Sequence, residues 1–496
     1  MVIDMKETVL VLLPVFVPVV TGLIILFGRP FQNRRLLLCV TAAGLLITAG
    51  LAGYVLFLGD VQYTLFDLTD MLSVYFKVDA VGRLFVCVVT LIWLCSGLYA
   101  FEYMKHEENN KRYFGFYLVV YGILIGLDFS GNLITFYLFY ELMTLLSMPL
   151  VLHNRSHEAI MAGLKYLFYS FAGAYMVLLG IYFIYHYGNT LTFTAGGVFE
   201  SGVLAEQNGL LLTVAFLMLL GFGVKAGMFP LHAWLPTAHP VAPAPASAAL
   251  SGIIVKGGVL GIVRVVFYIF GADFLRGTWV QTVWMSLALL TVFMGSMLAF
   301  LEGGFKKRLA YSTVSQLSYI LFGLSLLEPT AFTGALLHVV FHAVIKCTLF
   351  LCAGAVIYQT GKTKIAELPG IGRQMPVTIW CYTIVSLALI GIPPFSGFVS
   401  KWYLAVGALH SEAGLFTWLG PVVLLISALL TAGYLLPVTI KGFLPGNDFD
   451  DTSCPKKEAG KTMLLPILIL SALALVLGMF PGGLISYIGT VVSQIL

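Results

Sequence analysis

The sequence is poor in charge. Only 10% of its 496 residues are Asp, Glu, Lys or Arg, and 59% are hydrophobic. A soluble domain carries about 25% charged residues, so this composition excludes an ordinary soluble protein. It predicts an all-α polytopic membrane protein, because a helix satisfies its backbone hydrogen bonds internally in lipid.

The sequence also lacks the motifs of redox and nucleotide chemistry. It has no C-x-x-C pair, no iron–sulfur or zinc spacing, and no glycine-rich nucleotide loop after a strand. We therefore expect no cofactor, no metal and no nucleic-acid partner. The cysteines, most of them in apolar runs, are predicted to be buried thiols. They are Cys39, Cys87, Cys95, Cys347, Cys352, Cys381 and Cys454, of which only the last lies outside an apolar run.

Apolar runs of about 20 residues, the length that crosses a bilayer, recur along the chain. We count about fourteen, the first of which has no small-residue cleavage site after it and is therefore not a removable signal. The predicted spans are about 8–28, 36–58, 79–103, 113–129, 131–152, 159–187, 209–229, 245–270, 279–301, 308–327, 331–358, 376–410, 417–440 and 462–489.

The basic residues between these runs are unevenly distributed. Loops after odd-numbered spans hold 17 lysines and arginines, whereas the N-terminal tail and the other loops hold three, namely Lys6, Lys77 and Arg276. Because cytoplasmic loops are enriched in Lys and Arg, we expect both termini to face away from the cytoplasm. The predicted location is the cytoplasmic (inner) membrane of a prokaryote.

Two predicted spans are interrupted by proline. The seventh breaks at Pro230 after Lys225, and the twelfth breaks at Pro393 and Pro394 before Lys401. Matching breaks in two halves of a transporter point to inverted repeats and a midplane site, although a proline kink without a transport role is the alternative. We expect two inverted five-helix repeats, spans 4–8 and 9–13, with broken helices 7 and 12. The predicted units are residues 1–112 (spans 1–3), 113–278 (first repeat), 279–440 (second repeat) and 441–496 (cytoplasmic loop and last span).

Seven basic residues fall inside predicted spans. A charge at the bilayer centre costs roughly 2.5–3.5 kcal/mol on insertion scales. Arg83, Lys165 and Arg264 lie near span ends, where we expect them to snorkel to the interface. The remaining four are predicted to be functional, and they are Lys225, Lys256, Lys346 and Lys401.

Glu141 is a carboxylate near the middle of the fifth predicted span. Its own helix offers no opposite charge, so a partner must come from another helix, and Lys225 is the candidate. A protonated glutamic acid bonded to a backbone carbonyl is the alternative.

The eleventh predicted span carries His338, His342 and Lys346 at i, i+4 and i+8, on one helix face. Histidine both gives and takes a proton near neutral pH, so this stripe is predicted to relay protons. A zinc site is less favoured because no acidic third ligand is near and Lys346 would repel the cation. The preceding span is unusually polar and is predicted to hold water beside the stripe through Ser312, Thr313, Ser315, Gln316 and Ser318.

Burial favours loss of a lysine's proton, and a nearby carboxylate favours its retention. Glu141 would thus control Lys225, and the remaining lysines and histidines would form a chain of coupled proton sites. The motifs that carry this chain are FYLFYELMTL (136–145), GVKAGMFPLHAWLPTAHPVAPAPASA (223–248), GIIVKGGV (252–259), KKRLAYSTVSQLSY (306–319), HVVFHAVIKCTLFLCAG (338–354) and GIPPFSGFVSKW (391–402).

Together these motifs resemble the antiporter-like membrane subunits shared by Mrp-type multisubunit cation/proton antiporters, respiratory complex I and membrane-bound energy-converting hydrogenases. The resemblance is strong over about residues 130–410, and the chain looks most like an Mrp D-type subunit, or its counterpart in a hydrogenase or complex I. It implies fourteen spans, two inverted repeats and a polar axis through the membrane centre. By position, Glu141 resembles the family's glutamate, Lys225 its central lysine and Lys256 the connecting lysine. The stripe from His338 to Lys346 resembles the eleventh-helix relay, and Lys401 resembles the terminal lysine.

The expected function is proton translocation within a larger ion-pumping complex, with homologous antiporter-like and small membrane subunits as partners and Na⁺ as a candidate counter-ion. One rival is a standalone transporter of Na⁺ or a solute, but the breaks carry lysines where a cation site would want carboxylates. The other rival is a purely structural subunit, which the cost of the intramembrane charges disfavours.

Overall fold

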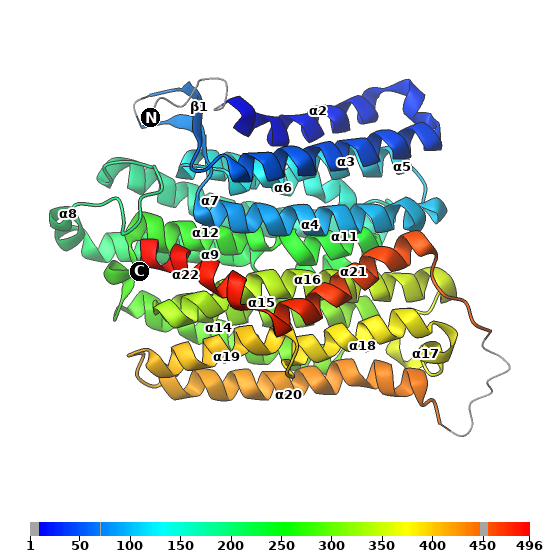
Figure 1. Cartoon of the computed structure of the whole chain (residues 1–496). Helices are drawn as coiled ribbons and strands as arrows, with labels where there is room; N and C mark the ends of the chain where they lie inside the picture. The colour runs from blue at the N-terminus through cyan, green and yellow to red at the C-terminus, as the bar shows by residue number, and fades with distance from the viewer. Residues whose placement is uncertain (1–8, 70, 447–454) are drawn as a thin grey trace.

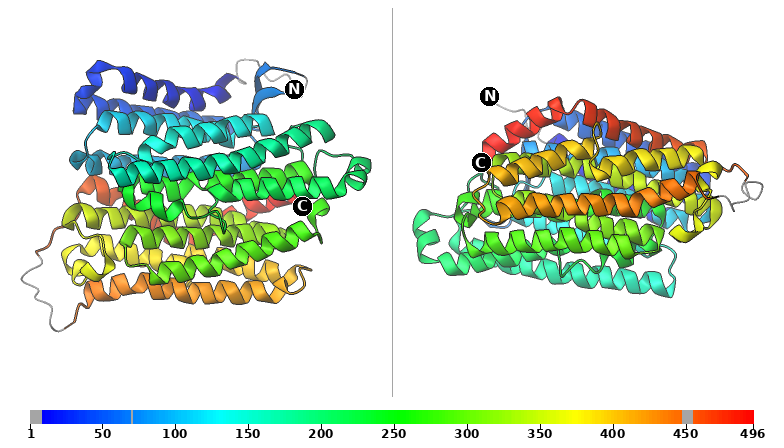
Figure 2. Two further views of the ribbon diagram at one scale, coloured as in Figure 1. Left: turned by 180° about the vertical axis from the view of Figure 1, so that it is seen from behind. Right: turned by 90° about the horizontal axis from the view of Figure 1, so that it is seen from below.

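The computed structural model describes residues 9–69, 71–446 and 455–496. Its helices lie side by side along a common direction, and the chain runs back and forth between the two ends of the bundle (Figures 1 and 2). A small sheet lies at one end, where the last helix also ends, and we call this the hairpin end. Helix α20 (Phe416–Phe443) ends and α21 (Lys461–Met479) begins at the opposite end, which we call the loop end (Figure 1).

The N-terminal part packs along one side of the bundle (Figure 1). Asn33 caps one of its helices by accepting from Arg35 N at 3.0 Å, and Asp79 caps another by accepting from Gly82 N at 2.7 Å. Its elements are a 3-10 turn (Leu10–Leu12), α2 (Leu13–Phe27), a 3-10 turn (Arg29–Gln32), α3 (Arg34–Phe57), β1 (Gln62–Asp67), β2 (Ser73–Lys77), α4 (Ala80–Tyr103) and a 3-10 turn (Met104–His106).

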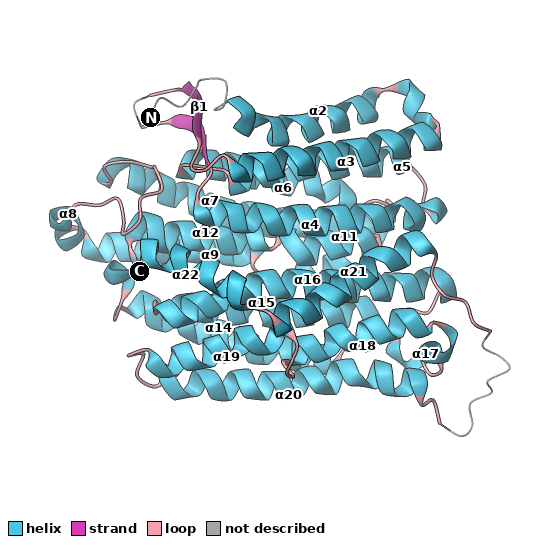
Figure 3. Ribbon diagram, viewed as in Figure 1, coloured by secondary structure: helices cyan, strands magenta, loops and turns pink. Residues whose placement is uncertain are grey.

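The antiparallel pair β1 and β2 corrects the prediction of an all-α chain (Figure 3). From its sequence, this segment is expected to be a polar loop between two spans. In β2 the apolar side chains of Val74 and Phe76 are buried and alternate with less buried neighbours, which is the period of a half-covered strand.

The middle part runs from α5 to α13. Its elements are α5 (Asn110–Asp128), α6 (Leu133–Val151), α7 (His157–Tyr187), α8 (Ser201–Glu206), α9 (Asn208–Lys225), α10 (Leu235–Val241), α11 (Ala244–Ala249), α12 (Lys256–Val263) and α13 (Ala272–Leu275). Two π-helical segments, Leu250–Ile254 and Arg264–Phe270, interrupt the α11–α12 span. Hydropathy alone does not distinguish such a span from a regular helix.

The C-terminal part forms the other side of the bundle, and its last two helices run across the front of the bundle in this view (Figure 1). The predicted last span consists of two helices, because Pro481 follows the first of them and cannot continue it. The elements are α14 (Trp279–Leu301), α15 (Phe305–Ser325), α16 (Pro329–Thr360), a 3-10 turn (Ile365–Glu367), α17 (Ile371–Gln374), α18 (Pro376–Ile390), α19 (Ser396–His410), α20 (Phe416–Phe443), α21 (Lys461–Met479) and α22 (Gly482–Ile495).

Among the described residues, 11 helices are long and apolar enough to cross a membrane, compared with about fourteen predicted spans. The differences have physical reasons. The first turn of α5 is polar, with Lys111 and Arg112, and α15 begins with three basic residues and continues with hydroxyl side chains. The predicted twelfth span is divided into α18 and α19, each of 15 residues.

Two long helical segments form the centre of the bundle. The most apolar stretch of Ala244–Phe270 is entirely buried and that of Pro329–Thr360 is 94% buried, whereas outer helices such as α3 bury a third of theirs. Polar side chains on these central segments are therefore surrounded by protein and not by lipid, which lowers the cost of placing them at membrane depth.

The prediction that the cysteines are buried is correct for Cys95, Cys347, Cys352 and Cys381. It is wrong for Cys39 and Cys87, which are exposed on the bundle surface. Apolar runs face lipid as readily as the core in a membrane protein, so hydropathy does not distinguish the two. Cys454 lies outside the described residues.

Candidate functional site

The first break places Lys225 at the last position of α9. Gly227 adopts a positive φ of 72°, which few other residues tolerate, and Pro230 follows. The backbone groups freed by the break find side-chain partners. Trp234 Nε1 donates to Val224 O at 2.8 Å, and Phe229 N donates to Thr291 Oγ1 at 3.0 Å. The interruption is thus satisfied inside protein, as a bilayer requires.

The Lys225 ammonium is fully buried and donates to three hydroxyls. Its Nζ lies 2.8 Å from Thr144 Oγ1 on α6, 3.1 Å from Tyr166 Oη and 3.0 Å from Ser170 Oγ on α7. It also lies 4.4 Å from the centroid of the Tyr166 ring, within cation–π range. Hydroxyls of this kind accept a hydrogen bond from the charged amine and can donate one to the neutral amine.

Glu141 does not form the direct ion pair with Lys225 that the sequence suggested. It is half-buried on α6, and its Oε1 is buried without a hydrogen-bond partner. Thr144, one turn farther along the same helix, bonds the lysine instead. The two charges remain close enough to interact electrostatically.

The second break places Lys401 on α19, just beyond the interruption. Gly391 ends α18 with a φ of 94°. The Lys401 Nζ reaches back to the last carbonyls of α18, 2.6 Å from Leu389 O and 3.1 Å from Ile390 O. These carbonyls lack helical partners and form the negative end of the helix dipole, so they stabilise a cation. The amine also lies 4.9 Å from the centroid of the Tyr319 ring.

Lys256 begins α12, directly after the first π-helical segment. Its Nζ donates to Ser251 O at 2.8 Å, a carbonyl within the π turn. The wider π turn changes the backbone pairing, and such turns are frequent at functional sites. The Ser251 hydroxyl in turn lies 2.8 Å from Thr313 Oγ1 on α15.

Lys346 on α16 meets the same stretch of α15. Its Nζ donates to Leu309 O at 3.1 Å and to Ser312 Oγ at 2.7 Å. Leu309 O also accepts from Thr313 Oγ1 at 2.9 Å. Lys256 and Lys346 are therefore joined through Ser251, Thr313 and Leu309, with each lysine bonded to a backbone carbonyl and with the Ser251 and Thr313 hydroxyls between them.

The two histidines continue the stripe on α16 toward the second break. His338 Nδ1 lies 2.9 Å from Ser400 Oγ, next to Lys401, and its ring stacks on Tyr319 with a centroid distance of 5.6 Å. The His338 and His342 rings are 5.8 Å apart. Both nitrogens of His342 and the Nε2 of His338 are buried without a partner, as are the amide atoms of Gln316 on α15. Water is the usual partner of such buried polar atoms.

Four of the predicted site residues, Lys256, Lys346, His342 and His338, therefore lie along one buried row, which ends at the part-buried Lys401. Lys225 and Glu141 lie at its other end, in the first half of the chain. A Cβ built at Gly258 would be 3.0 Å from Lys225 Cβ, so α12 packs directly on the lysine's helix.

The prediction of snorkelling holds for Arg83, which pairs with the exposed Asp60 at 2.6 Å. It is wrong for Arg264, which is 1% exposed and forms a bidentate ion pair with Asp79, one bond of which is 2.9 Å. Other helices cover the span, and Asp79 holds the guanidinium inside the protein, so the side chain does not extend to the interface. Asp128, buried at the end of α5, is not among the residues predicted from the sequence, although its position at the end of an apolar run is a signal.

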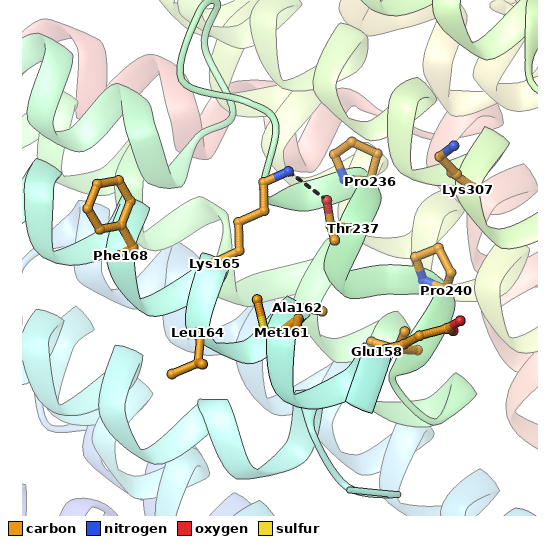
Figure 4. Close-up of a pocket in the computed structure, with 11 residues that line it drawn as sticks. Glu158, Met161, Ala162, Leu164, Lys165, Phe168, Pro236, Thr237, Pro240 and Lys307 are labelled. Atoms are coloured by element: carbon orange, nitrogen blue, oxygen red, sulfur yellow. Dashed lines mark hydrogen bonds between the residues drawn. The ribbon is translucent and has the colours of Figure 1, made fainter. Parts of the chain in front are cut away.

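Lys165 lies on α7 and lines an open cavity of about 810 Å³ between α7, α10 and α15 (Figure 4). Its Nζ donates to Thr237 Oγ1 of α10 at 3.1 Å. Glu158 and Lys307 also line this cavity. Lys165 thus bonds to the half-helix beyond the first break.

We find no group of three or more His, Cys, Asp or Glu side chains placed to hold a metal ion in the part of the chain that the structure describes. His338 and His342 are the nearest approach to such a group on the row. The lysines beside them make the site cationic.

Comparisons with known proteins agree with this architecture. Residues 130–431 match the family described as NADH:quinone oxidoreductase/Mrp antiporter, TM, and residues 69–114 match the NADH-ubiquinone oxidoreductase (complex I), chain 5 N-terminus. The chain is 30% identical to the N subunit of the NADH-quinone oxidoreductase of Desulforudis audaxviator, over 96% of each chain. It is 29% identical to the D subunit of the Na⁺/H⁺ antiporter of Alkalihalophilus pseudofirmus, over 98% of this chain and 97% of that one.

Solved structures show the same fold. A chain of the Mrp complex from Dietzia sp. superposes with a TM-score of 0.85 at 24% identity, covering 99% of this chain and 98% of that one. A chain of respiratory complex I from Thermus thermophilus gives a TM-score of 0.79 at 25% identity, covering 98% and 100%. The family match spans more than half of the sequence, and it includes both broken helices and the row of lysines and histidines. The chain therefore belongs to the NADH:quinone oxidoreductase/Mrp antiporter family of membrane subunits.

Proposed function

We propose that this chain is a proton-translocating subunit of a larger ion-pumping membrane complex. The observation that carries the proposal is the buried row of titratable side chains between the two broken helices. Ionisable groups at membrane depth are costly and mark proton pathways. Here the row lies beside hydroxyls and beside unpartnered buried polar atoms that can hold water, which proton transfer requires.

Each residue takes a role from its contacts. Lys225 is the switchable site, because its hydroxyl partners accommodate both its charged and its neutral form. Glu141 biases that switch through its charge. Lys256 and Lys346 hold the proton on either side of the Ser251–Thr313 contact. Because the carbonyls that bind both lysines cannot relay a proton, water beside the Ser251, Thr313 and Ser312 hydroxyls carries it between them. His338 and His342 relay it to Lys401, which exchanges it at the second break.

The same proposal includes the finer architecture. The chain would cross the membrane fourteen times. The 11 apolar helices account for most of these crossings, and α5, α15 and the α18–α19 pair provide the remaining ones. Spans 4–8 and 9–13 would form inverted repeats over residues 113–278 and 279–440, between the units 1–112 and 441–496. The hairpin end and both termini would face away from the cytoplasm of a prokaryotic cell, which cysteine labelling from each side tests.

The partners are proposed from the relatives. The relatives include a subunit of an Na⁺/H⁺ antiporter and chains of complex I and of a membrane-bound sulfane sulfur reductase. We infer that this chain works beside homologous antiporter-like and small membrane subunits, with protons and, at a contact with a sister subunit, Na⁺ as the transported ions.

The test is Lys225→Ala in everted membrane vesicles that contain the chain with its partner subunits. Proton flux should fall at least about tenfold, since an essential intramembrane titratable group is lost. Lys165→Ala is the matched control, a lysine at the edge of the bundle, and should transport normally. Assembly is checked on native gels. Normal flux in an assembled Lys225→Ala complex would refute the proposal.

A further inference from the structure

A second group of buried charges lies toward the hairpin end, away from the row described above. The Arg264 guanidinium is buried over the rings of Phe193 and Tyr268, 4.8 and 4.9 Å from their centroids. It pairs with Asp79, whose side chain is 20% exposed and therefore reaches solvent. This pair alone neutralises the arginine.

Asp128 is a second carboxylate near Arg264, whose charge the ion pair with Asp79 already neutralises. It is the last residue of α5, is 2% exposed, and lies close enough to Asp79 and Arg264 to interact with both charges. Its Oδ2 has no hydrogen-bond partner, and neither has the buried Nε of Arg264. A buried polar atom without a partner is unfavourable, so a water or a proton is expected here.

A small gap connects Asp128 to the central row. Asp128 and Lys256 line the same cavity, and the other walls are apolar side chains of α4, α5 and α16, among them Val88, Leu127 and Val339. The cavity has a volume of about 10 Å³, which admits at most one water molecule.

We propose that Asp128 is the acceptor of a gated side branch that carries protons from Lys256 to the hairpin end. This inference rests on the proposed function. The proton leaves the Lys256 ammonium, crosses the gap on a water, and binds the Asp128 carboxylate. It then passes beside Asp79 to the solvent, which leaves Lys256 neutral and Asp128 again ionised. The apolar walls keep the gap nearly dry, so the branch is closed until water enters.

The test adds one hydroxyl group to the wall of the gap, so that water can enter it. Val339→Thr keeps the side-chain shape but adds a hydrogen-bonding group to the wall of the gap. In vesicles containing the intact complex, the decay of an imposed pH gradient should accelerate at least about threefold, because water is now held in the gap. Val344→Thr, a buried position on the same helix that does not line the gap, should leave the decay unchanged.

According to the proposal, the protons that leak in Val339→Thr pass through the Asp128 carboxylate. Adding Asp128→Asn to Val339→Thr should restore the slow decay, and Asp128→Glu should keep the leak. Leu127→Ser serves as a second opening variant if Val339→Thr does not assemble. A leak that persists in the Asp128→Asn double variant, or no leak from either opening variant, would overturn the branch. The flux of Lys225→Ala is independent of this leak, so failure of the branch and failure of the proposed function can be told apart.

Discussion

At the residue scale, three lysines that are held by different partners illustrate how one side chain serves different tasks. Lys225 is held by hydroxyls, Lys256 by a single carbonyl in a π turn, and Lys401 by the carbonyl end of a half-helix. Carbonyls only accept hydrogen bonds and so favour the charged amine, whereas hydroxyls accommodate either form. Lys225 is therefore the site best suited to change its protonation.

His153 provides a residue-scale prediction outside the membrane spans. It follows α6 at the loop end, and burial, with the nearby Arg112 and Arg155, lowers its pKa from 6.5 to about 4. Because the folded chain binds this proton less readily than the unfolded chain, the histidine's contribution is complete above pH 6.5 and is lost as the pH falls toward 4. The thermal midpoint of the purified complex should fall over this range.

The variant His153→Phe removes the titrating group and should weaken that dependence. The two proteins are compared by melting in detergent at several pH values between 4 and 8. An equally steep fall in the His153→Phe protein would show that another group is responsible.

At the element scale, close helix packing positions the lysines. A Cβ at Gly258 of α12 would lie 2.6 Å from Phe222 O and 3.0 Å from Lys225 Cβ, so α12 can approach α9 only without a side chain there. A glycine inside a helix lowers the stability of that helix. Here the close packing of α12 against α9 compensates for this loss. The distance between the two lysine-bearing helices thus depends on this residue.

We predict that Gly258→Ala separates α12 from α9 and destabilises the chain by about 1–3 kcal/mol, as overpacking does. Proton flux should fall with it. Gly202→Ala on α8 is the matched control, because a Cβ there meets no atom within 4 Å. Thermal melting and flux of the two variants are compared. Equal behaviour of the two would contradict the packing argument.

At the scale of the whole molecule, one hydrogen bond joins the two halves of the row. Ser251 belongs to the middle part of the chain and Thr313 to the C-terminal part, and their hydroxyls lie 2.8 Å apart in the centre of the bundle. Both belong to buried segments, so no bulk water can replace the bond. Communication between Lys256 and Lys346 is therefore expected to depend on it.

We predict that Thr313→Val lowers proton flux about tenfold without loss of assembly, since it breaks a buried network at one link. Thr348→Val is the control, because the Thr348 hydroxyl bonds to Val344 O in its own helix. Flux in vesicles and native gels provide the measurements. Unimpaired flux in Thr313→Val would mean that the halves communicate by another route.

The class of the protein, most of its helices and the two breaks could be predicted from the sequence, whereas the roles of the seven candidate site residues remain predictions. A composition poor in charge indicates that the chain folds in a membrane. Apolar runs of about 20 residues indicate the membrane spans, and prolines indicate where two of the spans break. The spacing of His338, His342 and Lys346 also places them on a common helix face, whatever packs against that face.

Which groups meet could not be predicted in this way, because it depends on packing between helices. The hydroxyl cradle of Lys225, the burial of Arg264 against Asp79 and the gap beside Asp128 join residues that are distant in sequence. The π turns and the β-hairpin depend on packing as well. Hydropathy indicates that a residue lies within the membrane. The contacts between helices determine whether its side chain then faces lipid, another charge or a hydroxyl.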